Sequence, residues 1–138
     1  MEIDVRGPRF GAALTTVVLV AVLLTGSGWL LLAQTAVFAV GAVAGVQRSP
    51  YGWVFRTLVR PRLGPPPATE DAAPPRFAQG VGLLFAALGT VGYLAGPRWL
   101  GLAATGCALA AAFLNTVFAY CLGCEMYLLL RRATSPAR

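Results

Sequence analysis

The sequence contains no histidine and no lysine, and only five acidic residues among its 138 positions. The absence of histidine excludes catalysis and metal ligation by imidazole. The few carboxylates make an enzyme that acts alone the least expected function. Charged residues make up 12% of the chain and hydrophobic residues 57%, whereas soluble domains typically carry about 25% charged residues. These proportions predict an integral membrane protein, with the lipid bilayer as its first partner.

Arginine alone supplies the net positive charge of +6. Basic charge can indicate a nucleic-acid partner, but these arginines gather at the ends of apolar stretches, where they orient helices in a bilayer. We therefore expect no nucleic acid as partner, and no cofactor. The abundance of Ala, Gly, Pro and Arg without lysine indicates a GC-rich bacterial genome, and hence a location in the bacterial plasma membrane.

Two long apolar stretches each divide into two predicted helices. Residues 11–46 are almost wholly uncharged, which is too long for one crossing of about 20 residues. Glycines at residues 26 and 28 break this stretch, and Gly96-Pro97-Arg98 breaks the second. The prediction is an all-α membrane protein, one domain over residues 1–138, with four transmembrane helices at about residues 10–25, 29–47, 77–95 and 99–120.

The arginines are distributed unequally between the two ends of these helices. Only Arg98 lies in the turn within the second apolar stretch, while the other ten lie at the opposite ends. The positive-inside rule then places both termini and the linker between the second and third helices in the cytoplasm. The ten are Arg6, Arg9, Arg48, Arg56, Arg60, Arg62, Arg76, Arg131, Arg132 and Arg138.

The two halves of the chain share landmarks in the same order. Pro-Arg-Phe opens the first helix of each half, at residues 8–10 and 75–77, and Trp-Leu opens the second, at residues 29–30 and 99–100. This order predicts two tandem helical hairpins related by an axis along the membrane normal, over about residues 8–62 and 75–132. A Pro-rich cytoplasmic linker, residues 63–74, would join them. The alternative is that biased membrane sequence imitates similarity.

A short interfacial helix is predicted after each hairpin. Ser49 can cap the first, and Pro50 suits its first turn. The second would begin near Cys121, with Gly123 allowing the bend; the alternative is that the fourth helix runs on to Arg132. Pairs of small residues four apart predict close helix packing, either within one bundle or in a homo-oligomer: Gly41 with Gly45, Gly92 with Gly96, and Ala108 with Ala112.

Cys121 and Cys124 form the one candidate site for chemistry. A helix beginning at Cys121 would make its thiol more acidic than the reference pKa of about 8.5. The cytoplasm is reducing, so a permanent structural disulfide is not expected; a reversible dithiol, a persulfide carrier or a two-thiolate metal contact remain. Glu125 could take a proton from a thiol or pair with Arg131 or Arg132.

Two further residues of the fourth helix have structural interpretations. Cys107 is expected to be a small apolar packing residue. Asn115 is expected to form an interhelical hydrogen bond, with Gln34, Thr15 or Thr16 as candidate partners.

The chain resembles a family of small bacterial membrane proteins, common in actinobacteria, that is catalogued as a domain of unknown function. The resemblance spans nearly the whole chain and implies a four-helix membrane fold. Family members are often encoded near sulfurtransferase and thioredoxin-type genes, which implies thiol redox or sulfur transfer. The segments that carry the resemblance are residues 49–52 (Ser-Pro-Tyr-Gly), 60–64 (Arg-Pro-Arg-Leu-Gly), 75–77 (Pro-Arg-Phe) and 121–125 (Cys-Leu-Gly-Cys-Glu).

Three functions therefore compete. The first is a membrane partner of a cytoplasmic thioredoxin-like or sulfurtransferase protein, working through Cys121 and Cys124. The second is a non-catalytic scaffold or accessory subunit. The third, a small transporter of a sulfur species, is weaker, because ion and proton pathways usually need intramembrane ionisable groups.

Overall fold

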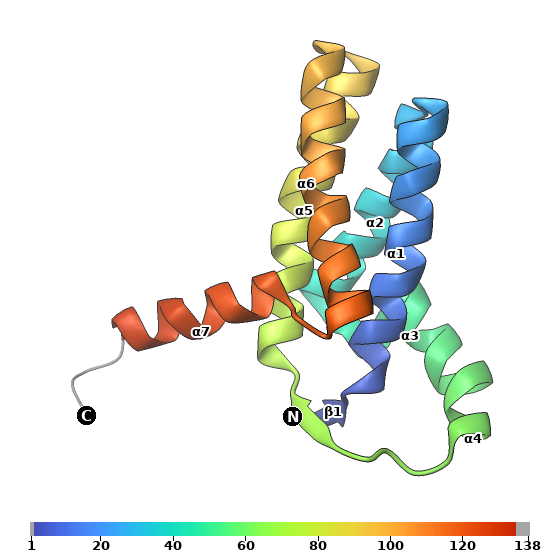
Figure 1. The fold of residues 1–138 in the computed structure, drawn as a ribbon, viewed down its shortest axis with the longest axis vertical. Coiled ribbons are helices and arrows are strands. Elements are labelled where there is room, and N and C mark those ends of the chain that lie inside the picture. The colour runs from blue at the N-terminus through green and yellow to red at the C-terminus, as the bar shows by residue number, and fades with distance from the viewer. Residues whose placement is uncertain (1, 135–138) are drawn as a thin grey trace.

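Four long helices pack side by side in the computed structural model, which describes residues 2–134 (Figure 1). They are α1 (Arg6–Thr25), α2 (Gly28–Ala44), α5 (Ala73–Leu94) and α6 (Arg98–Phe118). α5 packs on both α2 and α6, and α6 also packs on α1, whereas α1 and α2 touch less. The predicted all-α fold is confirmed, and α1, α5 and α6 are long and apolar enough to cross a membrane; α2, with 17 residues, is a shorter apolar helix.

Both predicted breaks between consecutive helices are present. α1 ends where Gly26 adopts a left-handed conformation (φ 67°), and the Ser27 side chain accepts the backbone N–H of Leu30 to cap α2. Pro97 precedes the first residue of α6. α1 and α5 begin about four residues before the predicted positions, because prolines in a first turn lack only an N–H that has no helical partner there.

Glycines let the helices of the bundle pack closely. A Cβ atom added to Gly92 would collide with the backbone of Gly101, and one added to Gly41 would collide with the side chain of Gln79. Gly92 therefore lies in the contact between α5 and α6, and Gly41 in the contact between α2 and α5. Their predicted partners Gly96 and Gly45 meet only neighbouring residues of their own segments, so each predicted glycine pair contributes one residue to helix packing. The buried apolar core beside these contacts consists of Leu19, Val22, Leu31, Phe38, Ala86 and Ala108.

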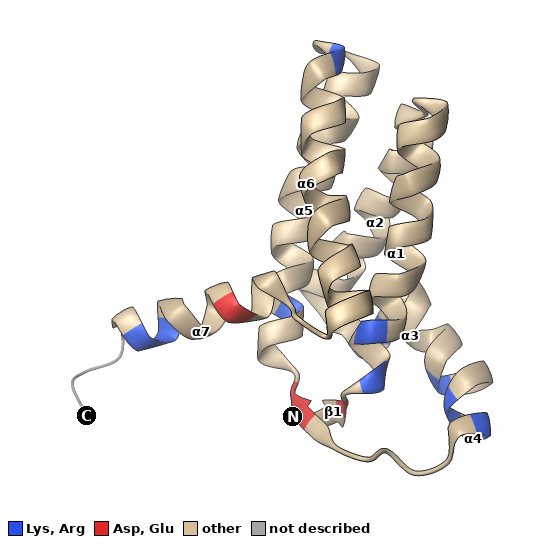
Figure 2. Ribbon diagram, in the orientation of Figure 1, with Lys and Arg blue, Asp and Glu red and all other residues tan. Residues whose placement is uncertain are grey.

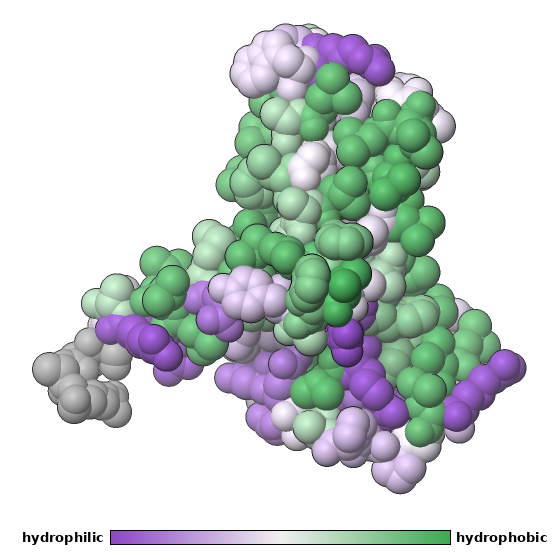
Figure 3. Space-filling model, viewed as in Figure 1, coloured by the Kyte–Doolittle hydropathy of each residue, from purple (hydrophilic) through white to green (hydrophobic). Residues whose placement is uncertain are grey.

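The outer surface of the bundle is apolar, and its charges gather at the ends. Large hydrophobic side chains such as Leu24, Val43 and Leu84 are exposed, and Figure 3 shows hydrophobic atoms covering the long helices. Arg98 lies at one end of the bundle, and the other described arginines lie at the opposite end (Figure 2). Arg138 lies outside the described residues. We call the end with many arginines the arginine-rich end.

Shorter helices extend from the arginine-rich end. After the 3-10 segment Val46–Arg48, the helical turns α3 (Pro50–Val54), a π-helical segment (Phe55–Val59) and α4 (Arg60–Leu63) follow without interruption. Ser49 caps α3 by accepting the Gly52 N–H at 3.1 Å, as predicted. The last helix, α7 (Leu122–Thr134), projects away from the bundle (Figure 1).

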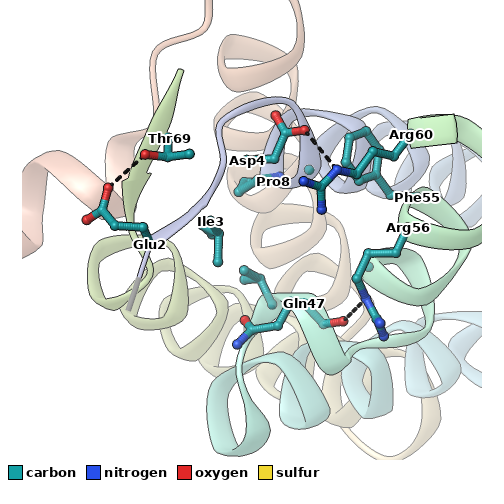
Figure 4. Close-up of a pocket in the computed structure, with 12 residues that line it drawn as sticks. Glu2, Ile3, Asp4, Pro8, Gln47, Phe55, Arg56, Arg60 and Thr69 are labelled. Atoms are coloured by element: carbon teal, nitrogen blue, oxygen red, sulfur yellow. Dashed lines mark hydrogen bonds and ion pairs between the residues drawn. The ribbon is translucent and has the colours of Figure 1, made fainter. Parts of the chain in front are cut away.

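The N-terminus and the Pro-rich linker form a strand pair that the sequence did not indicate. β1 (Glu2–Asp4) pairs antiparallel with β2 (Thr69–Asp71). Asp4 forms an ion pair with Arg6 (2.8 Å) and lies 3.8 Å from Arg60, so it connects β1 to α1 and α4. Figure 4 shows this corner, where a cavity of about 230 Å³ lies between β1, α3 and the start of α1.

The close contact between Gly92 and Gly101 predicts that a larger residue at position 92 destabilises the protein, and Gly106 offers a matched control. Gly92→Ala should lower the thermal unfolding temperature in detergent, because the added Cβ meets backbone that cannot move aside; overpacking of this kind costs about 1–3 kcal/mol. Gly106→Ala meets nothing within 4 Å and should instead stabilise its helix by roughly 0.5–1 kcal/mol. Equal effects of the two substitutions would contradict the packing of α5 on α6.

The ion pairs of Asp4 predict that the stability of the β1–β2 pair depends on pH. The hydrogen bond from the Arg6 side chain lowers the pKa of Asp4 below its usual value of 3.8. Ionised Asp4 therefore stabilises the folded strand pair, and this stabilisation is fully present above pH 3.8, the usual value. It is lost as the pH falls below 3.8, through the lower pKa of the folded state. Glu70 acts in the opposite direction, because burial and the nearby Glu2 raise its pKa. In a Glu70→Gln background, amide exchange at Ile3 and Asp4 should accelerate below pH 3.8 beyond its intrinsic pH dependence, and Asp4→Asn should abolish this acceleration. A pH response that survives Asp4→Asn would contradict the assignment.

Candidate functional site

The chain turns sharply between α6 and α7. α6 ends at Phe118, and Ala119 adopts the left-handed conformation (φ 56°) that ends it. The predicted break before Cys121 is confirmed, and the alternative of one helix running to Arg132 is wrong. The predicted role of Gly123 in the bend is also wrong, because Gly123 lies inside α7 and Ala119 makes the turn. A non-glycine residue in this conformation costs roughly 1–2 kcal/mol, so the surrounding contacts must hold it there.

Gly123 has a different role, which is to let α7 pack directly on α5. It is buried, and a Cβ atom added to it would collide with Cα and Cβ of Ala78. Four residues beyond, the Tyr127 ring packs on the Phe77 ring of α5, with centroids 5.6 Å apart. These two contacts hold the first turns of α7 against α5.

Cys121 immediately precedes α7 and caps it. The backbone N–H of Cys124 donates to Sγ of Cys121 at 3.1 Å, and the N–H of Glu125 donates to the Cys121 carbonyl at 3.0 Å. Sγ of Cys121 and Sγ of Cys124 are joined as a disulfide, with the two Cα atoms 5.2 Å apart. Both residues are partly exposed. The predicted pair is therefore brought together at the start of a helix, in its oxidised form.

Glu125 lies in the first turn of α7 and is exposed. Within residues 2–134, its carboxylate forms no ion pair, so the pairing with Arg131 or Arg132 considered from the sequence is absent. Arg131 instead lies over the Tyr127 ring, 5.9 Å from its centroid. No group of three or more His, Cys, Asp or Glu side chains that could hold a metal ion occurs in the described part of the chain.

A cavity of about 310 Å³ lies beside the disulfide, between α1, α2, α5, α6 and the start of α7. We call it the α7 cavity. It extends along α6 from Cys107 to Asn115, which is about 12 Å at 1.5 Å per residue, and Cys121 lies in its wall. Most of the remaining wall is apolar, and the long polar side chains in it are Gln79 and Asn115.

Two predictions about α6 are wrong, and both concern this cavity. Cys107 is exposed and lines the cavity rather than filling the core. The Asn115 side chain forms no hydrogen bond with any described residue. Gln34 uses other partners: it donates to the Thr15 hydroxyl, and it accepts the Tyr51 hydroxyl. The signal in the sequence that could have indicated a cavity is a polar side chain, Asn115, within an otherwise apolar helix.

This arrangement can carry two-electron chemistry. A disulfide at the surface of the bundle can be opened by an external thiolate, and the N–H of Cys124 stabilises negative charge on the Cys121 sulfur when the bond breaks. Glu125 and the described arginines add no second reactive group that contacts the sulfurs.

No curated protein and no solved structure matches the chain significantly. The family described as "Domain of unknown function (DUF4395)" matches residues 3–132, which is nearly the whole chain. The resemblance seen in the sequence is therefore confirmed at the level of the family, and the chain belongs to the DUF4395 family.

Proposed function

We propose that this protein exchanges electrons with a cytoplasmic dithiol protein at the membrane surface, through the Cys121–Cys124 pair. The observation that supports this most is that the two sulfurs form a disulfide at the start of α7, partly exposed at the arginine-rich end of the bundle. Disulfides in the cytoplasm are usually transient and catalytic or redox-sensing. A purely structural role suits this bond less, because the two cysteines are only three positions apart in the sequence. Linking so short a segment removes little conformational entropy from the unfolded chain.

The exchange balances as follows. A thiolate of the partner attacks one sulfur of the Cys121–Cys124 disulfide, and the other sulfur leaves as a thiolate. The second partner thiol then loses its proton and attacks the mixed disulfide. The partner ends as a disulfide, and Cys121 and Cys124 end as two thiols that have taken up two electrons and two protons.

The proposed membrane arrangement has four spans. α2 is about 25 Å long, short of a typical hydrocarbon core of roughly 30 Å. The following segment Val46–Arg48 and local thinning of the bilayer can supply the difference. The arginine-rich end would face the cytoplasm. α7 and the α3–α4 segment would then lie along the inner leaflet, with exposed apolar residues such as Leu58 and Leu129 in the lipid.

We further propose that the two halves are repeats, and three matching contacts support this. Phe10 of α1 packs on Phe55, and Phe77 of α5 packs on Tyr127, with ring centroids 5.7 and 5.6 Å apart. Ser49 caps α3 and Cys121 caps α7, each accepting the N–H three residues on at 3.1 Å.

The third match concerns arginines at helix ends. Arg9 of α1 donates to the Thr116 carbonyl of α6, and Arg76 of α5 donates to the Ala42 and Val43 carbonyls of α2. Each arginine therefore satisfies carbonyls at the end of the neighbouring helix, where helical partners are lacking. One difference stands against an exact repeat: α5 and α6 pack more closely than α1 and α2.

The exchange proposal predicts trapped mixed disulfides. In cells producing Cys107→Ser chains, adding Cys121→Ser or Cys124→Ser leaves one thiol, which can attack the disulfide of an oxidised partner and form a mixed disulfide that no second cysteine of this chain can resolve. After acid quenching and alkylation, each single-thiol chain should carry a thioredoxin-like protein that a reductant releases. Mass spectrometry of the adduct measures this.

The matched control is a chain in which all three cysteines are serine and Leu130→Cys places an exposed thiol elsewhere on α7. Adducts no more abundant than with this control would contradict the proposal and favour the scaffold. An adduct consisting of one extra sulfur atom would identify a persulfide carrier instead.

A further inference from the structure

We propose that the α7 cavity binds the ring of a lipid-soluble quinone, which oxidises the Cys121–Cys124 dithiol. This inference rests on the proposed function, because it names the acceptor of the electrons that the pair takes from its partner. The cavity of about 310 Å³ falls at the small end of ligand sites, which measure roughly 300–1,000 Å³. It is suited to a single ring system whose tail remains in the lipid.

Position is the first argument for this site. Cys121 belongs to the cavity wall, whereas Cys124 does not. One residue of the pair therefore borders the cavity between the long helices, and the other lies one turn further along α7. An acceptor in the cavity and a protein partner in the cytoplasm could thus reach the same disulfide from different sides.

Polarity is the second argument. Gln79 on α5 and Asn115 on α6 line an otherwise largely apolar space, and neither side chain forms a hydrogen bond within residues 2–134. A carboxamide that lacks a partner in apolar surroundings loses free energy, and a ligand that accepts its N–H can recover it. A quinone presents two carbonyl acceptors on a flat apolar ring, which matches two amide donors in an apolar cavity.

The comparison with the first half of the chain explains why space is left here. In the first half, Tyr51 follows the cap residue Ser49 by two positions, packs near Gly11 and donates its hydroxyl to Gln34. In the second half, Gly123 follows Cys121 by two positions and packs against Ala78. In the first half, a tyrosine side chain thus extends between the long helices. In the second half, the corresponding residue is a glycine in the cavity wall, which has no side chain to occupy that space.

The electron transfer balances without any further reactant. Two S–H bonds break and the Cys121–Cys124 bond forms, which releases two electrons and two protons. The quinone takes up both electrons, its two carbonyl oxygens take up the protons, and it leaves as the hydroquinone.

The first arm of the test measures binding alone, with no thiol chemistry. The full chain carrying Cys121→Ser and Cys124→Ser is placed in lipid nanodiscs and titrated with decylubiquinone, whose fully substituted ring cannot add thiols. Saturable binding near one per chain is expected, as is at least tenfold weaker binding when Ala111→Phe fills the cavity. Ala110→Phe is the matched control, because Ala110 is exposed and outside the cavity wall.

Asn115→Leu and Gln79→Leu should each weaken binding several-fold, because each removes one N–H donor. Absence of saturable binding, or equal binding to the Ala111→Phe and Ala110→Phe chains, would overturn the proposal. These readouts do not depend on a protein partner, so they can succeed or fail independently of the exchange function.

The second arm measures the reaction. Chains with Cys107→Ser and both cysteines of the pair reduced are mixed with decylubiquinone without oxygen. One hydroquinone should form per disulfide, at least tenfold more slowly in Ala111→Phe than in Ala110→Phe chains. Binding without oxidation of the pair would overturn the role of the quinone as electron acceptor, even if mixed disulfides with a partner are found.

Discussion

Direct contact between Gly123 and Ala78 places the start of α7 on α5. Because Gly123 has no side chain, the start of α7 lies directly against α5, and the rest of α7 projects from the bundle (Figure 1). Ala119 makes the turn before it in a left-handed conformation that costs free energy. The same contact puts Cys121 at the start of a helix and in the wall of the α7 cavity. The turn, the cap and the cavity therefore all depend on a position that can hold only a hydrogen atom.

A second constraint comes from the surroundings of the bundle. Carbonyls at the end of a helix lack helical partners, and no water satisfies them inside a bilayer. Arg9 and Arg76 donate to such carbonyls on α6 and α2 at the arginine-rich end. These arginines thus combine two roles, since their charge would orient the chain and their donors close the ends of neighbouring helices. The same two arginine side chains would therefore orient the helices in the membrane and also connect neighbouring helices at their ends.

Local chemistry made part of this structure predictable from the sequence. Gly26, Pro97 and Ser49 act through their own backbone or the next turn, so the helix breaks and the α3 cap could be placed correctly. The β1–β2 pair joins segments more than 60 residues apart and has no local signal. The role of Gly123 was misjudged because a glycine can serve either a turn or a close approach, and only its neighbour Ala78 decides which. The cysteine pair was found from its spacing, whereas the cavity beside it required the positions of five helices.

The proposed function requires an accessible, reversible disulfide that faces the cytoplasm. A membrane-impermeant maleimide, applied to oriented vesicles that contain the Cys107→Ser chain, tests this most directly. In inverted vesicles, whose cytoplasmic face is outward, two maleimides should attach to Cys121 and Cys124 after mild reduction and none before it. Right-side-out vesicles treated identically should remain unlabelled. Labelling from the outer face only, or failure to label after reduction, would contradict the central claim.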